Sequence, residues 1–172
     1  MDKLEQFQIE FKANACFRLD ESMRMVRITL NNISEEELWK KPNSSLNSIG
    51  NLILHVCGNL AQYGITSLAE TEDYRNREVE FATTEGFNKQ ELLTQLSETV
   101  NTVKSTIYNV DTIRLLDKQH VQGFEFSGIG NIIHVVEHFS YHTGQIAFWV
   151  KQLNNEQLGF YDGMDLNIKN QE

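Results

Sequence analysis

The sequence of 172 residues contains little proline and little cysteine. Its single proline is Pro42, and its two cysteines, Cys16 and Cys57, have no CxxC spacing. So few helix breakers favour long helices over a β-sandwich, which needs many turns. Two cysteines without a metal-binding spacing are typical of the reducing cytoplasm, so we expect a cytoplasmic location.

Long apolar runs and positive charge are also scarce. No segment reaches the roughly 20 apolar residues of a membrane helix, and the first residues contain no apolar signal core. The chain has 15 Lys and Arg against 24 Asp and Glu, a net charge of −9. Such a chain repels phosphate backbones. We therefore expect neither a membrane nor a nucleic acid as partner.

What the sequence does contain is helical periodicity. Apolar residues recur every three or four positions along four segments. These segments cover residues 2–32, 45 or 47 to 69, 88–109, and 127 or 131 to 153. Capping boxes at Ser34–Glu37 and Asn88–Glu91 predict a short helix at 34–39 and the start of the third segment. Residues 70–87 and 111–126 are expected as connections, the second with a helical turn at 113–116. We predict one all-α domain over residues 1–172, a four-helix bundle.

The last segment is apolar almost all round. A helix without a polar face is buried on all sides, so this one is either the central helix or packs against a second subunit. Phe139, Phe148 and Trp149 cannot all face a single core. Because an exposed aromatic patch is costly, we expect a homodimer.

Three histidines share one face of this last segment, because His134, His138 and His142 are each four residues apart. His55 lies in the second segment. Imidazole binds zinc, nickel, copper and iron well. Two ligands from one helix and one from a facing helix would leave coordination positions open. The spacing allows either His134–His138 or His138–His142, and a hydrogen-bond ladder between helices is the alternative to a metal.

Polar side chains accompany these histidines. Asn59 and Gln62 follow His55 at i+4 and i+7, and Gln145 follows the last histidine at i+3. We expect these three side chains to lie near the site. Cys57 points about 200° away from His55 around the helix, so we expect it in the core.

Two segments resemble the DinB/YfiT-like superfamily, and more closely one of its uncharacterised bacterial subfamilies. They are residues 47–60 (NSIGNLILHVCGNL) and 130–146 (GNIIHVVEHFSYHTGQI); residues 37–39 (ELW) before Pro42 and 77–81 (REVEF) fit as well. The resemblance covers nearly the whole chain. It implies up-down-down-up topology, commonly as a homodimer. It also implies a divalent metal, typically zinc or nickel, held by His55, His138 and His142, with His134 beside the ligands or in the pocket wall.

The resemblance also implies a class of activity. Characterised relatives are thiol S-transferases that use bacillithiol, mycothiol or glutathione-like cofactors, and a mycothiol-dependent maleylpyruvate isomerase. We therefore expect a metal-dependent transferase acting on a small molecule with a low-molecular-weight thiol. The alternatives are a hydrolase using bound hydroxide, or a non-catalytic protein whose metal pins the helices. A fourth ligand, from Cys57 or a carboxylate, would favour the non-catalytic alternative.

Overall fold

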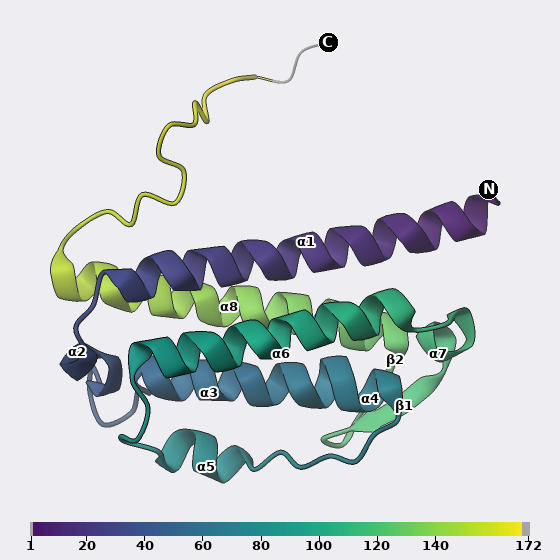
Figure 1. Cartoon of the computed structure of the whole chain (residues 1–172), viewed down its shortest axis with the longest axis horizontal. Helices are drawn as coiled ribbons and strands as arrows, with labels where there is room; N and C mark the ends of the chain where they lie inside the picture. The colour runs from purple at the N-terminus through teal and green to yellow at the C-terminus, as the bar shows by residue number, and fades with distance from the viewer. Residues whose placement is uncertain (1, 170–172) are drawn as a thin grey trace.

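Four long helices lie side by side in the computed structural model, which describes residues 2–169 (Figure 1). They are α1 (Lys3–Asn31), α3 (Ile49–Asn59), α6 (Lys89–Asn109) and α8 (Gly128–Asn154). Helices α1 and α8 run in one direction, and α3 and α6 run in the other. Helix α1 packs against α6 and α8, and α3 packs against the same two helices. The predicted four-helix bundle with up-down-down-up topology is confirmed.

Shorter elements complete the helical part. They are α2 (Glu35–Trp39), α4 (Ser67–Ala69), α5 (Arg77–Ala82), α7 (Thr112–Leu116) and the π-helix η1 (Leu60–Thr66), which joins α3 to α4. The capping boxes of Ser34 with Glu37 and of Asn88 with Glu91 are both formed, as predicted. π-helices are rare in proteins as a whole, and those that do occur are often found at functional sites. Here it directly follows the helix that carries His55.

A β-hairpin lies in the segment that we expected to be a connection. Strands β1 (Lys118–Val121) and β2 (Phe124–Ser127) pair antiparallel, with Val121 opposite Phe124. Gln122 and Gly123 form the two-residue turn, and both have positive φ, 51° and 81°. Two positive φ values characterise the type I′ turn, for which Asn-Gly is the usual sequence signal. The prediction was therefore incomplete here, whereas the helical turn expected at 113–116 is present as α7.

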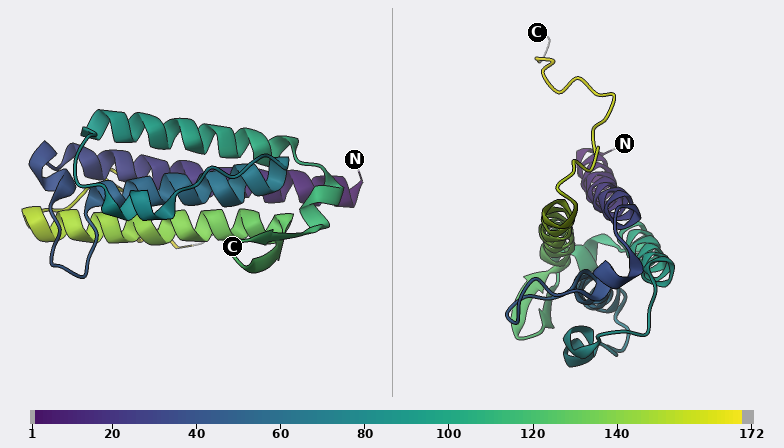
Figure 2. Two further views of the ribbon diagram at one scale, coloured as in Figure 1. Left: turned by 90° about the horizontal axis from the view of Figure 1, so that it is seen from below. Right: turned by 90° about the vertical axis from the view of Figure 1, so that its left-hand side faces the viewer.

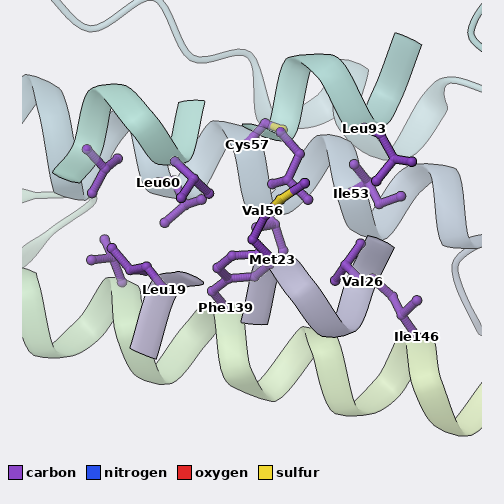
Figure 3. Packing of buried hydrophobic residues seen from close by; sticks show 14 of the residues in the cluster. Leu19, Met23, Val26, Ile53, Val56, Cys57, Leu60, Leu93, Phe139 and Ile146 are labelled. Atoms are coloured by element: carbon purple, nitrogen blue, oxygen red, sulfur yellow. The ribbon is translucent and has the colours of Figure 1, made fainter. Parts of the chain in front are cut away.

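The bundle core draws apolar side chains from all four long helices (Figure 3). Each buried leucine, isoleucine or phenylalanine contributes about 1.5–3 kcal/mol relative to an exposed one. The labelled residues are Leu19, Met23 and Val26 of α1, Ile53, Val56 and Cys57 of α3, Leu60 of η1, Leu93 of α6, and Phe139 and Ile146 of α8. Cys57 lies in the core as predicted, and burial raises the pKa of its thiol to about 12. Its thiol is therefore un-ionised and unreactive at neutral pH.

Helix α8 occupies a corner of the bundle rather than its centre. Phe139 is buried, but Ile133, Tyr141 and Phe148 are exposed, Phe148 by 71%. The idea that α8 is the central helix was therefore wrong, because one of its faces is left uncovered by α1 and α3. That face is still available to a second subunit, so the homodimer stays a prediction. Among residues 2–169, no helix has the length and apolar character needed to cross a membrane.

The connection between α4 and α6 contains the short helix α5, which lies outside the four long helices and against α3 (Figures 1 and 2). The side chain of Asn76 caps its first turn by accepting from the backbone of Val79. Asn51 of α3 is fully buried and donates to the carbonyls of Glu80 and Thr83, at 3.0 Å and 2.6 Å. The segment that we read as a surface connection is therefore anchored to the helix that carries His55.

Candidate metal centre

Helices α3 and α8 are antiparallel neighbours, and they bring three histidines to one point. The ring of His55 on α3 lies 5.0 Å, between centroids, from the rings of both His138 and His142 on α8. The two α8 rings are 4.5 Å apart. One ring nitrogen from each histidine lies within 4.8 Å of the other two. His55 and His142 are buried, and His138 is half-buried.

The tautomer of His55 follows from its partners. Its Nδ1 lies 2.8 Å from Oε2 of Glu80, and Nε of Arg75 lies 2.7 Å from Oε1 of the same carboxylate. Nη2 of Arg75 lies 3.1 Å from the same Nδ1, but it also lies 3.0 Å from Oε2 of Glu80 and donates to that oxygen. A carboxylate only accepts, so His55 donates through Nδ1 to Glu80 across the shorter distance of 2.8 Å. Its Nε2 therefore carries the lone pair that a metal ion needs. Burial by itself would raise the pKa of Glu80, but the hydrogen bonds from His55 and Arg75 outweigh burial and hold that pKa below its usual value.

A second tautomer is fixed on α8. Nδ1 of His142 lies 2.7 Å from Oε1 of Gln145, an amide oxygen that only accepts. His142 therefore also keeps its proton on Nδ1 and its lone pair on Nε2. This is the arrangement in which metal-binding histidines are usually held, with the second ring nitrogen donating to a neighbouring oxygen.

The spacing of the histidines fits a metal ion. Nε2 of His55 lies 3.2 Å from Nε2 of His138. Two nitrogens bound at 2.0–2.1 Å to a tetrahedral zinc ion would lie about 3.3 Å apart. His55 and His138 therefore already have the spacing of two ligands of one zinc or similar divalent ion, and the donor atoms of all three histidines lie within 4.8 Å of one another.

His138 and His142 remain neutral at physiological pH. Burial, together with the positive charge that each neighbouring histidine would carry, lowers the pKa of His138 to about 3. Burial lowers the pKa of His142 to about 4, although its bond to Gln145 acts in the opposite direction. Only a neutral imidazole binds a metal ion, so protons do not compete for these two ligands near pH 7.

His134 lies one helical turn before His138 and outside the three-histidine cluster. Its Nε2 faces Nδ2 of Asn59 at 3.0 Å, and its ring lies 4.1 Å from that of Tyr63. Burial lowers the pKa of His134 as well. Spacing alone left two histidine pairs open; in the structure the pair that meets His55 is His138 with His142.

The other polar residues predicted for the site lie at three different places. Asn59 contacts His134 and Gln145 contacts His142, as described above. Gln62 lies further from the histidines, where its Oε1 accepts from Nη1 of Arg75 at 2.9 Å. Gln62 therefore supports the arginine that pairs with Glu80, and it is one step removed from the ring of His55.

Glu80 and Arg75 are the residues that sequence reasoning missed. Both belong to the segment read as a surface connection, although residues 77–81 were part of the family resemblance. Gly58 of α3 makes their approach possible, because a Cβ there would clash with Oε1 of Glu80. A second signal for their position was the spacing of Asn51, His55 and Gly58, which lie on one face of α3. Because this face has polar and small side chains, it predicts a polar segment packed closely against it.

A pocket of about 630 Å³ adjoins the cluster and is lined by His55 and His142. Helices α3 and α8, helix α5, and the segment between α2 and α3 form its walls. Aromatic side chains supply much of the lining, and Gln145 also lies there. A cavity of this size holds a small organic molecule.

Comparison with known proteins agrees with the fold. The model of a family described as a protein of unknown function, DUF1572, matches residues 6–161. The crystal structure of the DinB-like protein YjoA from Bacillus subtilis is similar, with a TM-score of 0.65 and 16% identity over 86% of this chain and 96% of that chain. A conserved protein from Enterococcus faecalis gives a TM-score of 0.64 and 18% identity over 91% of this chain and 100% of that one. No curated protein matches the chain. The predicted DinB-like fold is confirmed.

Proposed function

Since the chain belongs to the DUF1572 family of proteins of unknown function and has a DinB-like fold, we propose that it is a metal-dependent enzyme. In this proposal, His55, His138 and His142 bind one divalent ion, zinc or nickel, and the reaction is transfer of a low-molecular-weight thiol to a small molecule. One observation carries the proposal. Among residues 2–169, neither Cys57 nor a carboxylate joins the three histidines as a fourth metal-binding group. Structural zinc sites usually have four protein ligands, whereas catalytic sites keep one position open.

The chemistry follows from the charge of the ligands. A divalent ion held by three neutral imidazoles keeps its full charge, and it would lower the pKa of a thiol bound to it and so favour the thiolate. The chain itself supplies orientation. Glu80 and Gln145 hold the rings of His55 and His142 with Nε2 unprotonated, and the adjoining pocket gives a small substrate access to that side of the cluster.

The proposal extends to partners and location. We propose a homodimer that covers the exposed face of α8, where Phe148 and Tyr141 lie, and a cytoplasmic location, which suits the two free, buried cysteines. Light scattering at micromolar concentration tests the dimer. A mass equal to the 19.9 kDa of one chain would contradict it.

Metal analysis and turnover test the enzyme. We expect about one zinc or nickel ion per purified chain. The loaded protein should consume an aryl halide together with glutathione or bacillithiol, and treatment with a chelator should abolish this reaction. His138→Ala should remove both the metal and the activity. His120→Ala is the matched control, because the side chain of His120 is 79% exposed on the hairpin.

Circular dichroism before and after chelation separates the alternatives. The core and the capping boxes do not involve the metal, so we expect the helices to persist without it. Loss of most of the helical signal would indicate a structural metal instead. Metal-dependent hydrolysis of nitrophenyl acetate without thiol would indicate a hydrolase. Retained helix without turnover of either kind would leave a non-catalytic metal-binding protein.

A further inference from the structure

The pocket beside the histidines differs in charge from the rest of the molecule. The chain carries 24 acidic side chains and a net charge of −9, yet among residues 2–169 no aspartate or glutamate lines this pocket. Four other surface pockets among residues 2–169 each have at least one carboxylate in their walls. The absence of carboxylates favours a ligand that is itself negatively charged, because like charges in a partly enclosed site repel strongly.

In the part of the chain that the structure describes, Arg77 is the one Lys or Arg in the pocket wall. Its guanidinium lies 4.9 Å from the ring centroid of Phe81, one helical turn along α5. Within residues 2–169 it has neither an ion-pair partner nor a hydrogen bond, in contrast to Arg75, which is paired with Glu80 in the interior. The aromatic face holds the guanidinium in place and leaves its N–H groups free for a planar anion.

The position of Arg77 sets the length of the ligand. The ring of Phe81 lies 4.8 Å from the ring of His55, so the guanidinium carbon is within about 10 Å of that histidine ring. The pocket lining also includes the apolar and aromatic side chains of Leu52, Tyr141 and Phe148. Phe148 and Tyr141 are exposed, and an apolar ligand would cover them.

We propose that this pocket selects small organic anions with an aromatic or aliphatic body. The carboxylate or sulfonate binds to Arg77, the body lies against the aromatic wall, and the other end reaches His55 and His142. This inference rests on the proposed function only for the role of the histidines. The selection by charge follows from Arg77 and the walls, and it is measured without metal.

Two fluorescent probes test this selection by charge. 8-Anilinonaphthalene-1-sulfonate and N-phenyl-1-naphthylamine share an aromatic body, and only the first carries a sulfonate. We expect the metal-free protein to bind one sulfonate probe per chain. Arg77→Gln should lower the affinity for the sulfonate probe at least about fivefold and change the affinity for the neutral probe less than about twofold. Arg27→Gln on α1 removes the same charge from another face and should change neither probe.

Further variants locate the probes and separate this inference from the metal. Phe148→Ala should lower the affinity for both probes, because it removes part of the pocket wall that both would contact. If it changes neither probe, they bind elsewhere and the proposal is overturned. The proposal is also overturned if Arg77→Gln and Arg27→Gln change the affinity for the sulfonate probe equally. It is overturned as well if the Arg77→Gln variant binds each probe as tightly as the unchanged protein does. His138→Ala should lose the metal and retain the preference for the sulfonate probe. The selection by charge can therefore be measured even if the histidines bind no metal.

Discussion

Glu80→Gln keeps the shape of the side chain and removes its negative charge. In the native protein the carboxylate accepts from His55 and from Arg75 at the same time. A glutamine has one oxygen, and Arg75 can only donate, so we expect that oxygen to remain with Arg75. The amide NH2 then faces Nδ1 of His55. His55 must accept there, its proton moves to Nε2, and the lone pair that faces the cluster is lost.

Two effects of this substitution can be sized. Loss of a group that orients a metal ligand typically weakens metal binding about 10–100-fold. The side chain of Arg75 is only 3% exposed, so it would remain as a buried charge without an anion. Breaking a buried pair in this way costs about 3–5 kcal/mol of folding free energy. For a chain of this length, each kcal/mol corresponds to about 2–4 °C in Tm, so we expect Tm to fall by about 6–20 °C.

Competition with a chromophoric zinc chelator measures the affinity. It is done at a temperature at which circular dichroism shows both proteins fully folded. The matched control is Glu78→Gln, because Glu78 is an exposed residue of the same helix without an ion pair among residues 2–169. A zinc affinity of the Glu80→Gln variant within twofold of the unchanged protein would refute the role assigned to the carboxylate, whatever happens to Tm.

Three further predictions concern the same region. His138→Ala should leave less than about a tenth of the metal by elemental analysis, whereas His134→Ala should retain it with affinity reduced at most about 10–100-fold; the opposite result would place the cluster one turn earlier on α8. The Tm of the metal-free protein should decrease as pH falls from about 6.5 to about 4. The pKa of His138 is about 3 and that of His142 is about 4 in the fold, whereas both are about 6.5 in the unfolded chain, which therefore binds more protons in this range. A flat Tm over this range would contradict the lowered pKa values. Gly58→Ala should weaken metal binding, because the added Cβ would displace the carboxylate of Glu80 on α5. Gly144→Ala is the control: a Cβ there meets nothing within 4 Å, so its effect on folding stability should be neutral or stabilising. Equal metal affinity of the two variants would exclude a role for the close approach at Gly58.

Local signals in the sequence predicted the helical framework. The capping boxes at Ser34 and Asn88 depend on residues three positions apart, and both form as expected. The apolar spacing along each segment likewise reports on the turns of a single helix. These features are independent of distant parts of the chain, which is why the long helices and the bundle could be predicted.

The surroundings of the histidines depend on contacts that no local pattern encodes. Glu80 lies 25 residues from His55, in a segment whose polar composition is equally typical of an exposed loop. The spacing of the α8 histidines could not decide which pair meets α3, because that depends on the register between two helices. The hairpin was missed for a related reason: Gln122 adopts a positive φ that asparagine or glycine adopts more readily.

Helix α5 links the metal cluster to the proposed anion site. Arg77, Glu80 and Phe81 are spaced i, i+3 and i+4, so all three lie on one face of this short helix. Glu80 faces His55, Phe81 lies against the same ring at a tilt, and Arg77 lies over Phe81 at the pocket wall. Because Asn51 fixes the end of α5 through two backbone carbonyls, the orientation of one helix determines both the tautomer of His55 and the position of the cation. A shift of α5 would therefore alter metal binding and anion binding together, whereas a change confined to α8 can alter the metal site alone.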